Sequence, residues 1–415
     1  YDDFIATKQF EDVASGFEPG DVTPHAFDFQ AAIIRWALRR GRAAIFANTG
    51  LGKTLMQMDW ARAVVEYTCQ PVLVVAPLAV AKQSVREAEK FDIDARYIRE
   101  QPTLESPEIL VTNYEMLDQF TLSDFGGVVL DESSIIKNRE GKMRKAIISA
   151  CQSVPYRLSC TATPSPNDYM ELGNQAEFLG VMGMDEMLAM FFTHDGADTS
   201  KWRLKGHGEA KFWEWMATWA VTITKPSDIG FDDSGYDLPP LSMHEHLVPS
   251  PASSGDMFTE IAQTLTERRQ AKKDTLHNRV NKVADMINAD NNQWLVWCHT
   301  NDESDALARA MPDAIEVKGS DKNENKENRM AGFIDGSIRV LVSKPSICGF
   351  GLNLQNCCKM AFVGLDDSYE QMYQAIRRCW RFGQDQPVDV HIVTAEALGA
   401  IRQNIERKEA QMAEM

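Results

Sequence analysis

The stretch "AIFANTGLGKT" at residues 44–54 decides the fold. It begins as an apolar strand, turns through a Gly-rich segment and enters a helix that starts near Lys53. This order predicts a phosphate-binding loop, because backbone N–H groups and a helix N-terminus can both face phosphate oxygens. Lys53 would reach the β- and γ-phosphates, and the Thr54 hydroxyl would ligate Mg²⁺. The loop residues assigned to the nucleotide are Thr49, Gly50, Gly52, Lys53 and Thr54.

One position departs from the general GxxxxGK[ST] pattern of such loops. Ala47 stands where the pattern has its first Gly. Ala is the nearest residue in size, so the turn survives if Ala47 has a negative φ. An ordinary Gly-rich strand–helix turn is the alternative interpretation, and it explains the GKT sequence less well.

Short apolar runs alternate with helical stretches on both sides of this loop. Runs of four to eight residues separated by helices predict βαβ units and a parallel sheet covered on both faces. A second set of runs begins near residue 293, so we expect an α/β fold with two RecA-like lobes in tandem. The predicted strands are 43–47, 71–77, 108–113, 126–132 and 156–164, then 293–300, 314–319, 338–344, 359–364 and 388–394.

The segment between the two sets has a different composition. It is rich in Met and Trp at 201–220 and then in Gly, Asp and Pro at 232–242, which indicates a helical insertion followed by a linker. Its tryptophans are interpreted as the core of a small helical subdomain, with nucleic-acid stacking as the alternative. The expected domains are an N-terminal extension (1–24), a first lobe (25–170), the insertion and interlobe linker (171–255) and a second lobe (256–415).

Composition and charge narrow the class of protein. The formal charge of -17 disfavours a chain that coats DNA by bulk attraction, but a local basic groove needs only a few Lys or Arg. No apolar run is long enough for a membrane span, and the first residues do not resemble a signal peptide. The eight cysteines are scattered without a CxxC, which argues against structural zinc and disulfides and favours a cytoplasmic protein.

A carboxylate pair follows the strand expected at 126–132. Asp131 and Glu132 would lie at the carboxyl edge of a parallel sheet, where ligands bind. Asp131 would hold Mg²⁺, and Glu132 would act as the base that polarises an attacking water. A capping box at a helix start explains a lone acidic pair equally well. The phosphate loop about 80 residues earlier makes the metal interpretation the stronger one.

The order of these segments resembles superfamily 2 helicases and translocases. The closest resemblance is to Swi/Snf-like members, through "TATPSPNDYMELGNQAEFLG" (161–180), "SICGFGLNLQNC" (346–357) and "QAIRRCWRFGQ" (374–384). The combination of "FANTGLGKT" with "LDESSIIK" also resembles compact phage and prophage helicases of DEAD/DEAH type. "DESS" replaces the DEAH of many Swi/Snf proteins, and Arg377 stands where the family has Gly.

The resemblance implies roles for further residues. Gln30 would recognise adenine, and Thr161 and Thr163 would couple hydrolysis to strand contact. In the second lobe, Gly351 and Gln374 would approach the nucleotide. The residues expected to contact nucleic acid are Pro77, Thr112, Asn113, Tyr114, His299, Thr300 and Lys344.

The arginines of "QAIRRCWRFGQ" divide by position. On a helix, Gln374, Arg378 and Arg381 would share one face at i, i+4 and i+7, whereas Arg377 would point away from it. A guanidinium binds phosphate through a planar fork, so Arg378 and Arg381 are predicted to neutralise charge on the γ-phosphate. A solvated basic helix is the alternative, and it is the preferred interpretation for Arg377.

The resulting hypothesis is an ATP-dependent motor, with ATP and Mg²⁺ between the lobes and duplex DNA as the favoured track. Lys53, Asp131, Glu132, Arg378 and Arg381 would be its catalytic residues. The expected setting is the cytoplasm of a bacterial or phage-infected cell. A strand-separating helicase on DNA or RNA is one alternative, and single-stranded DNA is a possible partner. An ATP-switched clamp that recruits a protein partner is another.

Overall fold

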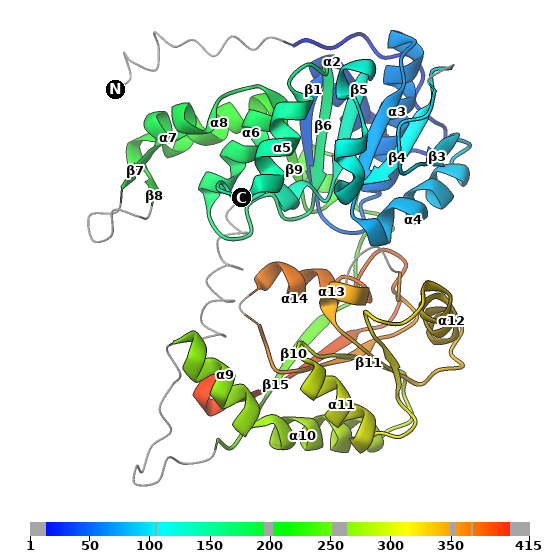
Figure 1. Ribbon diagram of the computed structural model, residues 1–415, viewed down its shortest axis with the longest axis vertical. Helices are drawn as coiled ribbons and strands as arrows, with labels where there is room; N and C mark the ends of the chain where they lie inside the picture. Colours follow the sequence, from blue (N-terminus) through cyan, green and yellow to red (C-terminus); the bar gives the residue numbers. More distant parts are fainter. Residues whose placement is uncertain are drawn as a thin grey trace. The chain divides into compact units, whose positions relative to one another are not determined.

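Two compact units make up the chain, and the division between them falls between Asp233 and Ser234. The computed structural model describes residues 14–103, 106–194, 202–250, 264–348, 353–366 and 368–398. Each unit is built around its own parallel β-sheet with helices on the faces (Figure 1). The predicted fold of two tandem RecA-like α/β lobes is therefore confirmed.

The first unit contains a seven-stranded sheet in the order β3-β4-β2-β5-β6-β1-β9. Every neighbouring pair is parallel. All residues of β2, β4 and β5 are buried, as expected for strands covered on both faces. The strands are β1 (Arg42–Ala47), β2 (Val72–Ala76), β3 (Ala95–Tyr97), β4 (Ile109–Asn113), β5 (Gly127–Asp131), β6 (Tyr156–Thr161) and β9 (Ala220–Ile223).

Helices connect these strands and follow local sequence signals. The first helix ends at Gly41, whose φ of 73° is one that glycine adopts without strain. The connecting α-helices are α2 (Asp28–Arg40), α3 (Lys53–Thr68), α4 (Leu78–Glu89) and α5 (Lys142–Cys151). Short 3₁₀ turns are η1 (Tyr114–Gln119), η2 (Leu122–Asp124), η3 (Ser133–Ile136) and η4 (Tyr169–Glu171).

A helical projection extends from the first unit, away from its sheet (Figure 1). Phe212, Trp215 and Trp219 are buried in its core, which agrees with the core interpretation of the Trp-rich segment. Trp202 and Trp213 are only partly buried. The projecting elements are α7 (Met184–Phe191), β7 (Phe192–His194), β8 (Trp202–Leu204), η5 (Gly206–Gly208) and α8 (Glu209–Trp219). Helix α6 (Leu172–Leu179) packs against β1 and β6 of the sheet, and η6 (Pro226–Ile229) follows β9.

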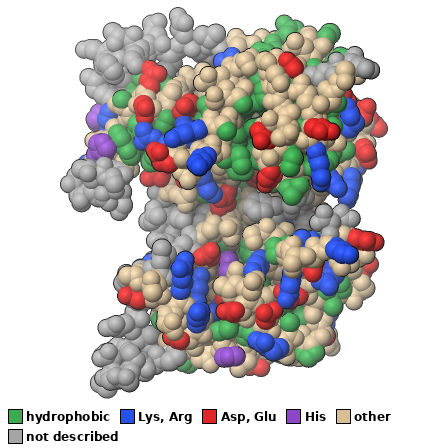
Figure 2. Space-filling view, in the orientation of Figure 1, with side chains coloured by type: hydrophobic (Ala, Val, Ile, Leu, Met, Phe, Trp, Pro, Cys, Tyr) green, Lys and Arg blue, Asp and Glu red, His purple; other side chains and the backbone are tan. Residues whose placement is uncertain are grey.

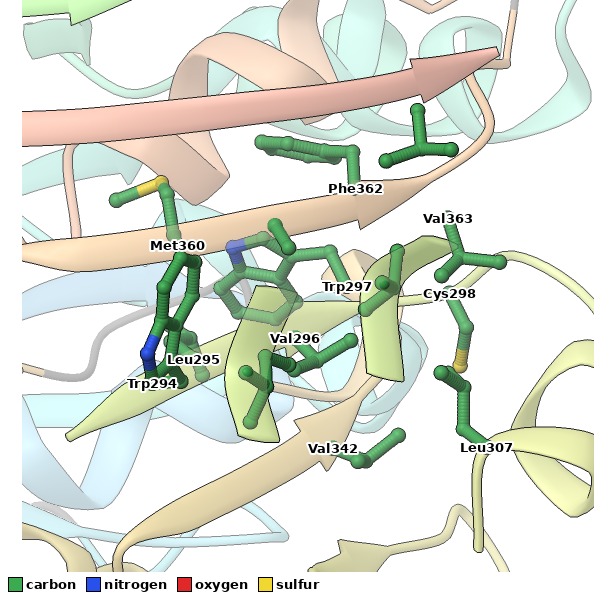
Figure 3. Close-up of a cluster of buried hydrophobic side chains, with 14 of the residues drawn as sticks. Trp294, Leu295, Val296, Trp297, Cys298, Leu307, Val342, Met360, Phe362 and Val363 are labelled. Carbon is green, nitrogen blue, oxygen red and sulfur yellow. The ribbon is translucent and has the colours of Figure 1, made fainter. Parts of the chain in front are cut away.

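The second unit contains a six-stranded parallel sheet in the order β10-β15-β14-β11-β13-β12. Trp294, Trp297 and Phe362 are central to its core (Figure 3). The strands are β10 (Leu241–Val248), β11 (Trp294–Trp297), β12 (Ile315–Val317), β13 (Val340–Ser343), β14 (Lys359–Val363) and β15 (Val388–Ala395). The helices are α9 (Leu265–Asp274), α10 (Leu276–Asn288), α11 (Asn301–Ala310), α12 (Asn323–Ile334), α13 (Pro345–Cys348), α14 (Tyr369–Ile376) and the 3₁₀ turn η7 (Glu396–Leu398).

The expected insertion and linker, 171–255, contain two strands that belong to the main sheets. β9 pairs with β1, and β10 pairs along its full length with β15. Strand β10 is hard to recognise from its sequence because it is an exposed edge strand with Ser, His and Glu among its residues. Only long-range pairing identifies it. No helix in the described ranges is both long enough and apolar enough to cross a membrane.

Candidate active site

The phosphate loop between β1 and α3 has the geometry that its sequence predicts. Gly50 and Gly52 have φ values of 96° and 78°, which glycine adopts without a Cβ penalty. Ala47 ends β1 and is not among the described residues with positive φ, so it replaces the first Gly without strain. Helix α3 begins directly after Gly52 without a side-chain cap, which leaves its first N–H groups facing the loop.

Lys53 is the first residue of this helix, and its side chain folds back onto the start of the loop. Its Nζ donates hydrogen bonds to the carbonyl oxygens of Ala47 (2.8 Å) and Asn48 (3.4 Å). The Thr49 hydroxyl is buried and has no hydrogen-bond partner within the described part of the chain. A partly buried cation, an unsatisfied buried hydroxyl and uncapped N–H groups around one turn fit a polyphosphate anion.

Gln30 lies against the phosphate loop although it is 20 residues earlier in the sequence. Its Nε2 donates to the Leu51 carbonyl (2.9 Å), and its Oε1 accepts from the Phe27 N–H (3.0 Å). A Cβ on Gly52 would come within 2.2 Å of the Gln30 Nε2, so replacing this second loop glycine would force the Gln30 side chain to move. The structure thus brings Gln30 to the nucleotide loop, and its role in recognising adenine stays a prediction.

The carboxylate pair follows β5 at the carboxyl edge of the sheet. Asp131 is buried, and its Oδ1 accepts from Gln57 Nε2 (2.7 Å) and from the Glu132 N–H (3.1 Å). Burial raises the pKa of Asp131 above its ordinary value, against the opposing effects of the Gln57 hydrogen bond and the Lys53 charge. Glu132 has a φ of 50°, a left-handed conformation that a residue with a Cβ rarely adopts.

The predicted coupling residues connect to this pair. Thr161 ends β6, and its hydroxyl donates to Glu132 Oε2 at 3.4 Å. The Thr163 N–H in turn donates to the Thr161 hydroxyl at 3.1 Å. The Ser159 hydroxyl, on the same strand β6, lies within hydrogen-bond distance of both Ser133 Oγ (2.9 Å) and Gln175 Oε1 (2.5 Å). A change at Glu132 therefore reaches the segment after β6 through two hydrogen bonds.

Three of the predicted nucleic-acid contacts require correction. Thr112, Asn113 and Tyr114 are each no more than 2% exposed. The Thr112 hydroxyl donates to Ile98, and the Tyr114 hydroxyl donates to the Asp131 carbonyl at 2.7 Å. Buried side chains with internal partners cannot bind a phosphate backbone directly in this conformation. Pro77 remains partly exposed at the start of α4.

The predicted contact residues of the second unit lie together at the carboxyl ends of adjacent strands. His299 and Thr300 follow β11, Lys344 follows β13, and the Lys344 Nζ donates to Asn301 Oδ1 (2.6 Å). The Thr300 hydroxyl caps α11 by accepting from the Glu303 N–H, so it also has a structural role. Burial lowers the pKa of the His299 imidazole.

The arginine segment is only partly helical. Helix α14 ends at Ile376, so the predicted helical face through Arg381 is wrong, and Arg377, Arg378 and Arg381 lie in the turns that follow. Arg378 Nη2 still donates to Gln374 Oε1 at 3.0 Å. The helix stops because the chain turns back to pair the Arg378 carbonyl with the Leu354 N–H, a long-range bond that sequence periodicity does not reveal.

Arg377, for which a solvated position was the preferred interpretation, is instead 4% exposed. Its guanidinium lies 4.6 Å from the Trp380 ring centroid and 5.6 Å from that of Tyr373. Trp380 in turn donates its indole N–H to the Pro239 carbonyl at 2.7 Å. These stacked groups hold the arginine segment against the start of the unit. Gly351 lies outside the described residues.

Sequence reasoning missed Gln57 and Gln175, which support the site from behind. Gln57 follows Lys53 by four residues on α3, so both side chains face the same edge of the sheet. A Gln among the apolar residues 55–58 was the only local signal in the sequence, and the structure shows that it is buried. Gln175 Nε2 donates to the Ser133 carbonyl at 3.1 Å and so holds the segment after Glu132.

The comparisons with known proteins agree with this geometry. The DEAD/DEAH box helicase family matches residues 27–172, and the helicase conserved C-terminal domain matches residues 278–383. Protein p41 of Acyrthosiphon pisum secondary endosymbiont phage 1 is 26% identical, covering 89% of this chain and 92% of p41. Chicken DNA repair and recombination protein RAD54B is 30% identical over 34% of this chain but only 18% of its own length.

A solved structure of the Sulfolobus solfataricus SWI2/SNF2 ATPase core in complex with dsDNA covers 91% of this chain and 90% of that chain, at 18% identity and a TM-score of 0.47. The two family matches fall on the two units, one on each. They coincide with the phosphate loop and carboxylate pair in the first unit and with the arginine segment in the second. The chain therefore carries a DEAD/DEAH box helicase domain in its first unit and a helicase conserved C-terminal domain in its second, and it has a phage relative that aligns with 89% of its length.

Proposed function

We propose that this protein couples ATP hydrolysis to translocation along duplex DNA. The observation that carries the proposal is the continuous hydrogen-bonded path in the first unit, from Gln57 through Asp131 and Glu132 to Thr161 and Thr163. A site built only to bind ATP needs no hydrogen-bonded link from its general base, Glu132, to the segment that follows β6. A motor needs one, because hydrolysis must alter its grip on the track.

The residues present fit ATP and Mg²⁺. The orphaned Thr49 hydroxyl and the Lys53 ammonium suit the phosphates, and the Thr54 hydroxyl and Asp131 carboxylate supply the oxygen ligands that Mg²⁺ prefers. When bound, Mg²⁺ would neutralise charge on the β- and γ-phosphate oxygens.

The other site residues act on the reacting groups. Lys53 leaves its loop carbonyls to bind phosphate, and Glu132 accepts a proton from the attacking water. Arg378 and Arg381 are the residues proposed to neutralise charge that develops on the transferred group. An arginine in this role contributes about 10³–10⁵ in rate. The Arg378–Gln374 hydrogen bond orients one of the two guanidinium groups beforehand.

Duplex DNA is the proposed track because the Swi/Snf-like motifs run through the chain and because RAD54B is, by name, a DNA repair and recombination protein. Pro77 in the first unit, and His299, Thr300 and Lys344 in the second, are the proposed contacts. Just beyond the carboxyl ends of their strands, Thr300 is exposed and Pro77, His299 and Lys344 are partly exposed, which supports this choice. Gln30 is proposed to recognise adenine.

The decisive experiment compares ATPase stimulation by duplex DNA, single-stranded DNA and RNA, with triplex displacement as the measure of translocation. Duplex stimulation together with displacement is expected. Preference for a single strand would favour the strand-separating helicase, and stimulation without displacement would favour the ATP-switched clamp. An ATPase indifferent to every nucleic acid would refute the motor.

A variant separates chemistry from binding in the same assays. Arg381→Ala is expected to retain ATP affinity while losing turnover, because the side chain acts on the transferring phosphate and does not hold the ground-state nucleotide. Arg269→Ala in exposed α9 is the matched control and should match the wild type in both. Unchanged turnover in Arg381→Ala would remove this arginine from the site.

A further inference from the structure

The projection of the first unit carries a short two-stranded ribbon, β7 and β8, that the ATP site does not use. The strands are antiparallel, with Phe192 opposite Leu204, Thr193 opposite Arg203 and His194 opposite Trp202. Phe192 is buried in the core of the projection and anchors the ribbon. The loop between the strands, which includes Asp195 and Asp198, lies outside the described residues and is no part of the proposal.

One side of this ribbon is hollowed and cationic. A pocket of about 340 Å³ is lined by Thr193, Arg203, Leu204, Lys205, Gly206 and His207. Its lining holds two permanent cations and an imidazole, and none of the six lining residues is acidic. This is unusual in a chain with a formal charge of -17, and it favours an anionic ligand.

The positive charge of the pocket is held in place. Lys205 Nζ donates to the carbonyl oxygens of Ala189 (2.8 Å) and Met190 (3.1 Å) near the C-terminus of α7, where a helix end favours a cation. The ammonium is therefore fixed at the pocket wall and adds its charge without mobility. Binding to a fixed cation costs less conformational entropy than binding to a flexible one.

Arg203 is the residue that remains available for a partner. Its side chain is exposed, and within the described ranges it forms no ion pair. Five other arginines of this unit form ion pairs with acids: Arg39 with Glu18, Arg62 with Asp59, Arg96 with Glu108, Arg139 with Asp185 and Arg144 with Glu177. Its guanidinium fork suits bidentate contact with a phosphate group.

The ribbon is also stiffened at its exposed end. The rings of His194 and Trp202 face each other across the strands, with centroids 3.9 Å apart. Cross-strand aromatic pairs stabilise such ribbons, which on their own are marginal. Figure 2 shows histidine and Lys/Arg side chains near one another at this end of the first unit. A two-stranded ribbon is narrow enough to follow a groove of duplex DNA.

We propose that the cationic pocket of the β7–β8 ribbon binds the phosphate backbone of duplex DNA, as a contact additional to the track residues of the two sheets. The proposal rests on duplex DNA being the partner of the motor. It assigns the projection a role of its own: to retain the duplex on the protein while the grip of the main sheets changes.

The test is fluorescence anisotropy of the full chain with a labelled blunt duplex, across a salt series and without nucleotide. Arg203→Glu is expected to weaken binding several-fold and to reduce the salt slope by about one unit, because one phosphate contact is lost. Arg203→Lys should recover most of the affinity. Arg35→Glu is the matched control, since Arg35 is an exposed arginine of α2 in the same unit and the charge change is identical.

Three results would overturn the proposal. The first is wild-type affinity and salt slope in Arg203→Glu, and the second is an equal loss in Arg35→Glu, which would reveal only a net-charge effect. The third is absence of duplex binding by the wild type. Unfolding midpoints of the variants show that each is folded. DNA stimulation of the wild-type ATPase is measured separately. The motor hypothesis is therefore retained if only the ribbon contact is refuted, and the ribbon contact is retained if only the stimulation is absent.

Discussion

Replacing Arg279 by Met should destabilise the second unit strongly, although its sequence context is a run of exposed basic residues. The Arg279 side chain is fully buried. Its guanidinium donates to Glu303 Oε1, to the Val363 carbonyl and to the Lys272 carbonyl, each at 2.7 Å, and to the Thr275 hydroxyl at 3.3 Å. Methionine has a similar length but no hydrogen-bond donor, so the substitution leaves four acceptors without their donor and creates no large cavity.

The magnitude follows from what remains behind. Breaking a buried ion pair by removing one partner costs about 3–5 kcal/mol, out of about 5–15 kcal/mol for a typical domain. Burial by itself would raise the pKa of Glu303, but the Arg279 charge and hydrogen bond and two backbone N–H groups hold that pKa below its ordinary value. For a unit of this size the loss corresponds to a fall in Tm of about 6–20 °C.

Thermal and urea unfolding of the full chain, followed by circular dichroism and tryptophan fluorescence, measures the effect. Arg269→Met, the same substitution on exposed α9, should change stability by no more than about 0.5 kcal/mol. Arg279→Met combined with Glu303→Gln should recover part of the loss, because the buried charge is gone while an acceptor oxygen remains. A loss in Arg279→Met no greater than that of Arg269→Met would refute the reasoning.

Three further predictions concern other sites. Burial lowers the pKa of His391 to about 4, so between pH of about 6.5 and about 4 the unfolded chain binds a proton at this residue and the folded chain does not. The free energy of unfolding should therefore decrease as the pH is lowered through this range. His391→Gln should flatten the profile of urea midpoint against pH, and an unchanged profile would contradict the assignment. Trp380→Phe removes the indole donor to Pro239 and should lower ATPase kcat with KM for ATP retained, whereas a change in KM alone would show a role in binding. Gly52→Ala would force a Cβ to within 2.2 Å of Gln30 Nε2 at a φ of 78° and should weaken binding of a fluorescent ATP analogue at least several-fold; unchanged affinity would show that the loop can relax.

Much of the candidate site's local geometry was predictable because its residues are adjacent in the chain. The phosphate loop, the start of α3 and the carboxylate pair after β5 each depend on a few consecutive residues. Parallel strands bring their carboxyl ends to one edge, so the proximity of Asp131 to the loop followed from the predicted fold. Gln57 was missed because a Gln in an apolar helix gives no indication of which acid it meets.

The arginine and nucleic-acid segments were less predictable because burial decides their roles. Arg377 and Arg279 each lie in a basic run, yet one stacks on Trp380 and the other pairs with Glu303. Thr112 and Tyr114 lie in a matching motif, but their hydroxyls are used inside the unit. No spacing rule separates these arginines from the exposed Arg203.

By itself, the sequence determined the two-lobed parallel fold, the phosphate loop and the location of the carboxylate pair. These depend on local propensity, on hydrophobic periodicity and on backbone freedom at particular glycines. Tertiary structure alone decided that β9 and β10 complete the sheets, that α14 stops before the arginines, and which cations are buried. The physical reason is that strand pairing and burial are fixed by partners distant in the chain, whose identity local sequence does not contain.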